Sequence, residues 1–335
     1  MRLLITASFH KEGLQLLSPH AIIKHEDWRT TGQVYWGEEL LEKIRETQAD
    51  AIIVEADAVT EEVFEGTTLK FVGCARDTPK EIDVEAATTH GVPVFIAPGR
   101  NAESVADLTI LLMLAQARKL IRTERTLKSG QVHIESAEDF TKLLESLKGH
   151  ELGRSTVGIV GLGQIGSRVA KRLQGFGATV LFFDPFLEAE KGKEVGAEKV
   201  DLETLLRTSD FVSLHVRATP ETFRMIGKEQ LRWMKPTAHL INTARSAIID
   251  EDALFEALKT GQIAGAGLDV HSHEPVDSNN RFLAFDNVTV TPHVGGNTID
   301  VIYRQSIILA TDIKLFLQGE TPKYLANPEV LNISR

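Results

Sequence analysis

Short apolar runs alternate with amphipathic stretches along the first hundred residues. The runs typical of buried strands cover 2–7, 21–25, 51–54, 70–74 and 92–96. A helical pattern at 37–46 separates two of these runs, and a Pro-Gly break follows the last of them. Because strands that alternate with helices form parallel sheets, this part of the chain predicts an α/β domain.

A second series of the same kind follows a long apolar helix predicted at 102–120 and polar, helical residues at 125–152. Its strands are predicted at 156–161, 179–184, 211–215, 238–242, 265–269 and 288–290, with a last helix at 300–318. The pattern predicts two Rossmann-like or flavodoxin-like α/β domains with parallel sheets. Residues 1–100 and 298–335 form one domain, and 101–297 form a second domain inserted in the middle of the chain. Ligands of such folds bind at the carboxyl ends of strands.

The most specific signal is the segment VGIVGLGQIG at 157–166, an apolar strand followed by a glycine turn and a helix. Gly161 permits a tight turn, Gly163 lets the backbone approach a pyrophosphate, and Gly166 lets the helix pack on the strand. The next strand ends in Asp184, whose carboxylate suits ribose hydroxyls and repels a 2′-phosphate. The combination predicts an NAD site. An ordinary strand–turn–helix corner is the alternative.

Composition narrows the choice of partners. The 335 residues carry a net charge of −10 and no basic stripe, so we expect no nucleic-acid partner. No apolar run is long enough to span a membrane. The single cysteine, Cys74, lies in an apolar strand and is expected to be structural, in a cytoplasmic protein. The broad apolar surface of helix 102–120 predicts a homodimer through the cofactor domains.

Three later segments place reactive side chains after strands: Arg245, Glu274 and His293. Taken singly, each has a simpler explanation, namely a surface ion pair, a solvated loop acid and a structural histidine. Together they match the reduction of a 2-keto acid to a 2-hydroxy acid. That reaction needs a cation for the carboxylate, a proton donor near the ketone oxygen, and a carboxylate that orients the donor.

These motifs resemble the D-isomer-specific 2-hydroxyacid dehydrogenases over about 68–335. The shared features include the glycine turn with Asp184, the segment NTAR at 242–245, GLDV at 267–270 and TPH at 291–293. The resemblance implies that Arg245 binds the substrate carboxylate, His293 is the acid/base, and Glu274 pairs with it. It implies cofactor contacts by Gly161, Gly163, Gln164, Ile165, Gly166, Asp184, His215, Val216, Thr243, Ala244, Asp269 and Gly295. Candidate substrate contacts are Ala75, Arg76, Asp77 and Arg100, with surface charges as the alternative for the two arginines. The only close histidine pair, His271 and His273, has a poor spacing for a metal site and no cysteine nearby, so we expect no metal.

The chain departs from the family pattern at 75–79, where many members have a glycine-rich loop. Pro79 lacks an N–H group and Asp77 carries a negative charge, so the identity of the substrate stays open. Ser246 stands where glycine is usual, and a positive φ there would be strained. A binding protein of the same fold, an NADH-responsive scaffold or corepressor with little turnover, is the alternative function.

Overall fold

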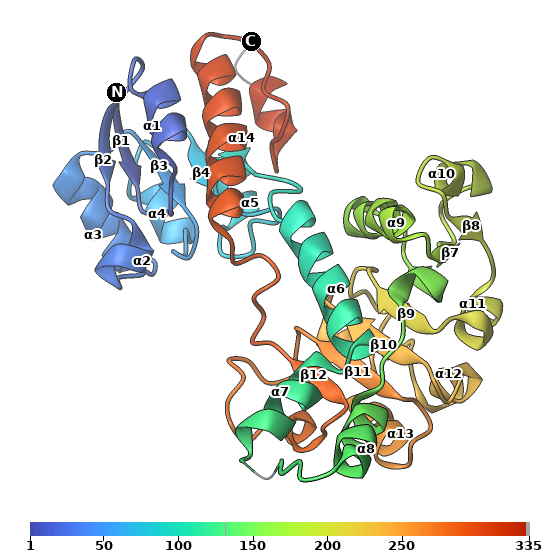
Figure 1. The fold of residues 1–335 in the computed structure, drawn as a ribbon. Helices are drawn as coiled ribbons and strands as arrows, with labels where there is room; N and C mark the ends of the chain where they lie inside the picture. The colour runs from blue at the N-terminus through green and yellow to red at the C-terminus, as the bar shows by residue number, and fades with distance from the viewer. Residues whose placement is uncertain (131, 333–335) are drawn as a thin grey trace. The chain divides into compact units, whose positions relative to one another are not determined.

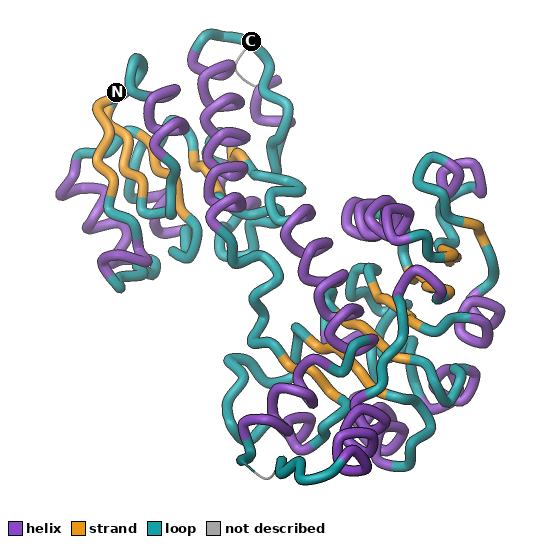
Figure 2. Tube along the Cα trace, in the orientation of Figure 1, coloured by secondary structure: helices purple, strands orange, loops and turns teal. Residues whose placement is uncertain are grey.

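A computed structural model describes residues 1–130 and 132–332 of the chain. It divides into two compact units, of which the first comprises Met1–Asn101 and Thr298–Arg335 and the second Ala102–Asn297. Each unit contains one sheet, and all the paired strands that the structure describes are parallel. Helices flank these strands in both units (Figure 1, Figure 2). The predicted fold class, two parallel α/β sheets, is confirmed.

The sheet of the first unit has five strands in the order β2-β1-β3-β4-β5. Their bounds are Arg2–Ile5 (β1), Ile22–His25 (β2), Ala51–Val54 (β3), Val72–Cys74 (β4) and Val94–Phe95 (β5). This order is that of flavodoxin-like sheets. In these sheets β2 is added on one side of β1, and the later strands are added on its other side. The central strand β3 is buried along its whole length. That burial explains why its sequence is apolar at every position rather than at alternate positions.

Two apolar clusters cover the two faces of this sheet. One contains α3 (Glu38–Thr47), α4 (Glu61–Glu65) and α5 (Val84–Thr89), and the other contains α1 (Lys11–Leu17) and α14 (Ile299–Leu317). A short helix, α2, spans Trp28–Thr31. Figure 1 shows α14, in red, alongside α1, in blue. The last long helix of the chain therefore completes the unit that the first strand begins.

The sheet of the second unit has seven strands in the order β12-β11-β10-β9-β6-β7-β8. Their bounds are Thr156–Val160 (β6), Thr179–Phe183 (β7), Glu198–Lys199 (β8), Phe211–Leu214 (β9), His239–Asn242 (β10), Gly265–Leu268 (β11) and Val288–Val290 (β12). The order reverses between β6 and β9, as in dinucleotide-binding folds, which bind their ligand outside such a reversal.

Helices cover both faces of this sheet as well. Their bounds are Ala102–Ala117 (α6), Leu120–Lys128 (α7), Ala137–Leu147 (α8), Gln164–Phe176 (α9), Ala189–Lys193 (α10), Leu202–Thr208 (α11), Lys228–Trp233 (α12) and Glu251–Lys259 (α13). Side chains of α6 and α9 join one apolar cluster, and side chains of α11, α12 and α13 join the other. Most of α6 is buried, in keeping with its long apolar run.

Two details differ from the pattern in the sequence. The helix predicted to reach residue 120 ends at Ala117, because Lys119 adopts a left-handed backbone with φ of 49°. The edge strand β8 is only two residues long and consists of Glu198 and Lys199, so it carries no apolar run.

None of the helices in the described residues is long and apolar enough to cross a membrane.

Phe95 tests the packing of the first unit. Its ring is fully buried and packs edge-on against Phe71 and Phe316, with ring centroids 5.5 and 5.6 Å away. We expect Phe95→Ala to lower the free energy of unfolding by about 3–5 kcal/mol, because the cavity left behind cannot collapse fully. The measurement is urea unfolding followed by circular dichroism. Trp36→Ala, at a side chain that is 62% exposed, is the control. Equal midpoints for the two variants would contradict this account.

Candidate functional site

The turn between β6 and α9 has the backbone that a dinucleotide loop requires. Gly161 has φ of +91°, and a Cβ there would lie 2.9 Å from a methyl group of Val216. A Cβ at Gly166 would collide with the carbonyl oxygen of Gly161, so α9 packs directly on the turn. At Gly163, by contrast, a Cβ would meet no neighbouring atom within 4 Å. The space beside Gly163 is therefore open to a ligand.

The first turn of α9 offers free hydrogen-bond donors. Gly163 precedes the helix and supplies no side chain to cap it. The backbone N–H groups of Gln164, Ile165 and Gly166 have no partner among residues 1–130 and 132–332. Such groups, together with the positive end of the helix dipole, favour an anion. This is the arrangement that a pyrophosphate needs.

Asp184 lies where the sequence places it, at the end of β7 next to the glycine turn. One carboxylate oxygen accepts a hydrogen bond from the N–H of Leu162 at 3.1 Å, and the other accepts from the N–H of Phe186 at 3.0 Å. The carboxylate is therefore fixed beside the turn. Each oxygen keeps a further acceptor site, which is what hydrogen bonds from ribose hydroxyls require.

His215 and Val216 follow β9 on the other side of the turn. The Nε2 atom of His215 is 2.8 Å from the hydroxyl of Ser213, whereas its Nδ1 atom is buried with no partner in the part of the chain that is described. Burial lowers the pKa of His215 to about 3, so the ring is neutral at ordinary pH. An unsatisfied buried nitrogen is costly, and a bound group could satisfy it. Together with the open glycine turn, this nitrogen fits a nucleotide cofactor.

A tight turn at the end of β10 presents the next three predicted residues. The side chain of Asn242 accepts a hydrogen bond from the N–H of Ala244 at 3.0 Å and donates one to the carbonyl oxygen of Arg245 at 2.9 Å. The hydroxyl of Thr243 lies 2.8 Å from that of Thr109 on α6. Sequence reasoning gave Asn242 no role, although an asparagine directly after an apolar strand is a typical turn signal.

Arg245 is exposed, and its Nη1 atom donates to the carbonyl oxygen of Ala244 at 2.5 Å. Ser246 starts a single 3₁₀ turn, Ser246–Ile248, and is not among the described residues with positive φ. The strain that a serine would suffer at positive φ is therefore absent. The turn leaves the guanidinium accessible to a carboxylate ligand.

Glu274 and His293 form a hydrogen-bonded pair. The Nδ1 atom of His293 lies 2.8 Å from Oε2 of Glu274, and Oε1 accepts a hydrogen bond from the N–H of His271 at 3.0 Å. Burial raises the pKa of Glu274, but the hydrogen bonds from His293 and His271 outweigh it and hold the pKa below its usual value. The imidazole is 46% exposed, and its Nε2 atom has no partner among the described residues. This arrangement leaves one ring nitrogen for proton exchange with a substrate.

Asp269 holds the turn that carries His293. Its carboxylate accepts hydrogen bonds from the hydroxyl of Thr291 at 2.6 Å and from the N–H groups of Val294 and Gly295 at 2.8 and 2.9 Å. The residue is only 1% exposed. His293 itself has a left-handed backbone with φ of 55°, which a few polar residues tolerate. Because three donors share one buried carboxylate, Asp269 fixes the position of the imidazole.

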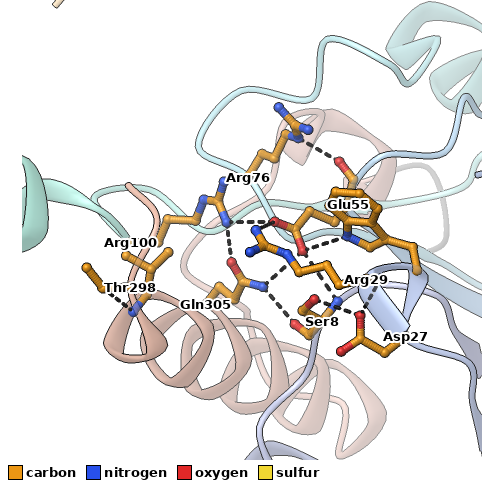
Figure 3. Close-up of polar contacts among 10 residues, drawn as sticks. Ser8, Asp27, Arg29, Glu55, Arg76, Arg100, Thr298 and Gln305 are labelled. Carbon is orange, nitrogen blue, oxygen red and sulfur yellow. Dashed lines mark hydrogen bonds and ion pairs between the residues drawn. The ribbon is translucent and has the colours of Figure 1, made fainter. Parts of the chain in front are cut away.

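Two of the predicted substrate residues, Arg76 and Arg100, lie at the carboxyl edge of the first unit's sheet, around a buried acid that sequence reasoning missed (Figure 3). Glu55 directly follows β3, and its side chain is 3% exposed. It pairs with Arg100 at 3.4 Å and with Arg29 at 3.5 Å, and its carbonyl oxygen accepts a hydrogen bond from Nε of Arg76 at 2.6 Å. Burial lowers the pKa of Arg100, and the charge of Glu55 opposes that shift. The signal was available, because Glu55 follows an apolar strand as Asp184 does.

The neighbours of Arg76 in the chain take no part in the network around Glu55. Ala75 is fully buried, and its N–H donates to the carbonyl oxygen of Val54 at 2.8 Å. Asp77 is exposed. Cys74, predicted to be structural, is buried, and burial raises the pKa of its thiol to about 12, which excludes a thiolate nucleophile at ordinary pH.

A cavity of about 880 Å³ lies at the opposite edge of the second unit's sheet, where the strands begin. The rings of Phe211 and His239 stack at this edge, and the ring of His150 lies tilted against both, with ring centroids 5.2–6.0 Å apart. None of the predicted site residues lines this cavity. Across the described residues, no group of three or more His, Cys, Asp or Glu side chains could hold a metal ion.

Comparison with known proteins agrees with this geometry. The family model described as "D-isomer specific 2-hydroxyacid dehydrogenase, NAD binding domain" matches residues 110–295. The chain belongs to this family. The matched residues contain the glycine turn, Asp184 and the Glu274–His293 pair. Family membership makes the protein an NAD-dependent oxidoreductase of 2-hydroxy acids and disfavours the alternative of an NADH-responsive scaffold.

Relatives and solved structures extend the similarity to nearly the whole chain. The chain is 40% identical to a glyoxylate reductase of Thermococcus litoralis over 88% of each protein. It is 38% identical to a D-3-phosphoglycerate dehydrogenase of Methanocaldococcus jannaschii, covering 98% of this chain and 59% of that protein. Its fold is similar to that of a D-lactate dehydrogenase with NAD⁺ from Lactobacillus jensenii, with a TM-score of 0.80 and 25% identity over 97% and 99% of the two chains.

The role of Asp269 in holding the His293 turn can be tested by substitution. In Asp269→Asn, an amide N–H₂ replaces one acceptor oxygen and faces a backbone N–H group. We expect the free energy of unfolding to fall by about 2 kcal/mol, because a buried donor is left unsatisfied. Thermal unfolding is the measurement, and Asp286→Asn, at a carboxylate that is 79% exposed, is the control. A variant as stable as its control would mean that the three hydrogen bonds do not hold the turn.

Proposed function

We propose that this protein reduces a 2-oxo acid to a D-2-hydroxy acid with NADH and catalyses the reverse reaction with NAD⁺, using His293 as the acid/base. The observation that supports this most directly is the pairing of Glu274 with His293 at 2.8 Å, on a turn held by a buried aspartate. A pair of this kind keeps the imidazole in one orientation.

The roles of the chain's own groups follow from their chemistry. Arg245 binds the carboxylate next to the reacting carbon, since a guanidinium donates two parallel hydrogen bonds to a carboxylate, and it polarises the carbonyl group. His293 gives a proton to the carbonyl oxygen during reduction and takes it back during oxidation. Glu274 orients the ring and stabilises the imidazolium. NAD(H), when bound, supplies or accepts the hydride.

The residues proposed to hold NAD gather around the turn between β6 and α9. The N–H groups of Gly163, Gln164 and Ile165 bind the pyrophosphate, and Asp184 binds the adenosine ribose. The remaining cofactor residues that we propose are Gly161, Gly166, His215, Val216, Thr243, Ala244, Asp269 and Gly295. In this proposal residues 101–297 are the NAD-binding domain.

The substrate domain in this proposal comprises 1–100 and 298–335, with Ala75, Arg76, Asp77 and Arg100 as contact residues. The relatives include proteins named glyoxylate reductase and D-3-phosphoglycerate dehydrogenase. Their names indicate the range of size and charge over which substrates should be tested. Both names denote enzymes of small 2-oxo or 2-hydroxy acids. The reaction class is therefore proposed with a small anionic substrate and no metal ion.

Substitution of His293 tests the proposal. We expect His293→Ala to lower kcat for reduction of a 2-oxo acid about 10²–10⁴-fold, because the general acid is lost. NADH binding, followed by its fluorescence, should be unchanged. The assay is NADH oxidation with glyoxylate, pyruvate and hydroxypyruvate, and His133→Ala, at an exposed histidine, is the matched control. Equal activity of the two variants, or no activity of the parent on any 2-oxo acid, would refute the proposal.

We also propose that the protein is a homodimer through its cofactor domain. The apolar breadth of α6 does not support this, because most of that helix is already buried. The support comes from α7 and α8 and their surroundings. No side chain of these two helices is buried, and six large apolar side chains in this region are each 49–59% exposed, namely Leu111, Leu120, Leu127, Ile134, Phe140 and Leu144. Exposed large apolar side chains in such number within one segment are typical of an interface.

Analytical ultracentrifugation tests the dimer. At micromolar concentration we expect the parent to sediment as a dimer and the double variant Phe140→Asp, Leu144→Asp to sediment as a monomer, because two buried charges would oppose association. Phe223→Asp, at another exposed phenylalanine, should leave the sedimentation coefficient unchanged. A parent that sediments as a monomer would contradict the proposal.

A further inference from the structure

His271 lies between the two segments that carry Glu274 and His293. It follows β11 in the chain and is only 5% exposed. Its N–H donates to Oε1 of Glu274 at 3.0 Å, and its Nε2 atom lies 2.9 Å from the carbonyl oxygen of Thr291. That carbonyl oxygen also accepts a hydrogen bond from the N–H of His293 at 3.0 Å. One buried residue therefore contacts both segments.

Four hydrogen bonds thus form a closed loop around the Glu274–His293 pair. Two of them run from His271, one to Glu274 and one to the carbonyl oxygen of Thr291. The other two run from His293, one from its N–H to the same carbonyl oxygen and one at 2.8 Å between its imidazole and Glu274. The carboxylate of Asp269 makes no such link, because among residues 1–130 and 132–332 it bonds only to the turn of His293. His271 is the residue that ties the acid to that turn.

The direction of these hydrogen bonds follows from their acceptors. A carbonyl oxygen only accepts, so the ring of His271 carries its proton on Nε2 and donates to Thr291. The Nδ1 atom of the same ring lies 3.4 Å from the amide nitrogen of Asn280. The orientation of that amide is set in turn, because its oxygen accepts a hydrogen bond from the N–H of Phe282 at 3.0 Å. Both ring nitrogens are therefore in use, and the ring cannot turn over without losing two hydrogen bonds.

The Glu274–His293 pair needs such support because it is exposed to solvent. The side chains of His293 and Glu274 are 46% and 36% exposed. An exposed ion pair gains little stability by itself, since both side chains can rotate into water. The N–H of His271 occupies Oε1 of Glu274, which leaves Oε2 for the imidazole. The orientation of the carboxylate is thus supplied from outside the pair.

We propose that His271 is a positioning residue for the acid/base. Its ring keeps the segment of Glu274 in register with the turn of His293, so that the imidazole presents its Nε2 atom to the substrate. The inference rests on the proposed function of His293, and it assigns His271 no contact with substrate or cofactor. A small displacement of a reacting group lowers the rate of the chemical step, so we expect the effect in kcat.

Substitutions that remove or keep the donor at Nε2 test the proposal. His271→Phe keeps a planar ring and the backbone N–H but cannot donate to Thr291. We expect it to lower kcat about 10–100-fold for the 2-oxo acid that the parent reduces fastest, with little change in KM or in NADH binding followed by fluorescence. His271→Gln, whose amide N–H₂ can take the place of the Nε2–H group, should restore most of kcat. His273→Phe, at an exposed histidine of the same segment, is the matched control.

A second measurement needs neither cofactor nor turnover. A carboxylate only accepts, so the Nδ1 proton of His293 lies in the hydrogen bond to Glu274 and should give a low-field proton NMR resonance in the protein without NADH. His293→Ala assigns the resonance by its absence. The resonance should be lost from His271→Phe and kept in His271→Gln and His273→Phe. Circular dichroism checks folding, and His271→Asn, whose shorter amide reaches only the position of Nδ1, replaces His271→Phe should that variant not fold.

Loss of both kcat and the resonance in His271→Phe, with recovery of both in His271→Gln, would support the positioning role. A His271→Phe variant that keeps either of them, or a His271→Gln variant that does not recover both, overturns it. A parent that reduces no 2-oxo acid overturns the proposed function instead, and the resonance then still decides whether His271 holds the pair.

Discussion

All functional side chains of this molecule depend on one constraint, namely that its strands run parallel. Parallel strands end at the same edge of a sheet, so residues far apart in the chain become neighbours there. In the second unit this brings the turn after β6, Asp184 after β7, His215 after β9 and Arg245 after β10 to one edge. In the first unit it gathers Glu55 and its arginines in the same way. The constraint explains why the sites consist of loop residues while the strands between them are apolar.

The buried carboxylates at the carboxyl edges of the two sheets make different kinds of contact. Asp269 accepts three hydrogen bonds from one short segment and so fixes a turn. Glu55 collects longer contacts, at 3.3–3.5 Å, from side chains and backbone on several elements. The first arrangement is local and holds the imidazole of His293 in place. The second joins α2 and α14 to the segments around Ser8 and Arg100. Asp269 and Glu55 both follow an apolar strand in the sequence. The first carboxylate fixes a local turn, whereas the second joins segments that are distant in the chain.

The sequence predicts what local chemistry determines and misses what tertiary packing determines. Strands β3 and β12 agree with their predicted limits, because short apolar runs have sharp ends. The glycine turn was predictable, since each glycine has a distinct steric reason. Strand β8 was missed because an edge pair of charged residues has no apolar signature. The contact of Gln305 with Arg100 could not be predicted either, because the two residues are 205 positions apart. The sequence pattern of the helix that carries Gln305 indicates only that one face is buried.

The packing of α14 on α1 has a consequence for synthesis of the chain. Side chains of α14 (Leu309, Ala310 and Ile313) belong to the same apolar cluster as those of β1 and α1, so segments on both sides of the second unit together cover one face of the first sheet. The inserted second unit is contiguous and can fold as it leaves the ribosome. The first sheet, in contrast, keeps part of that face uncovered until α14 has been made.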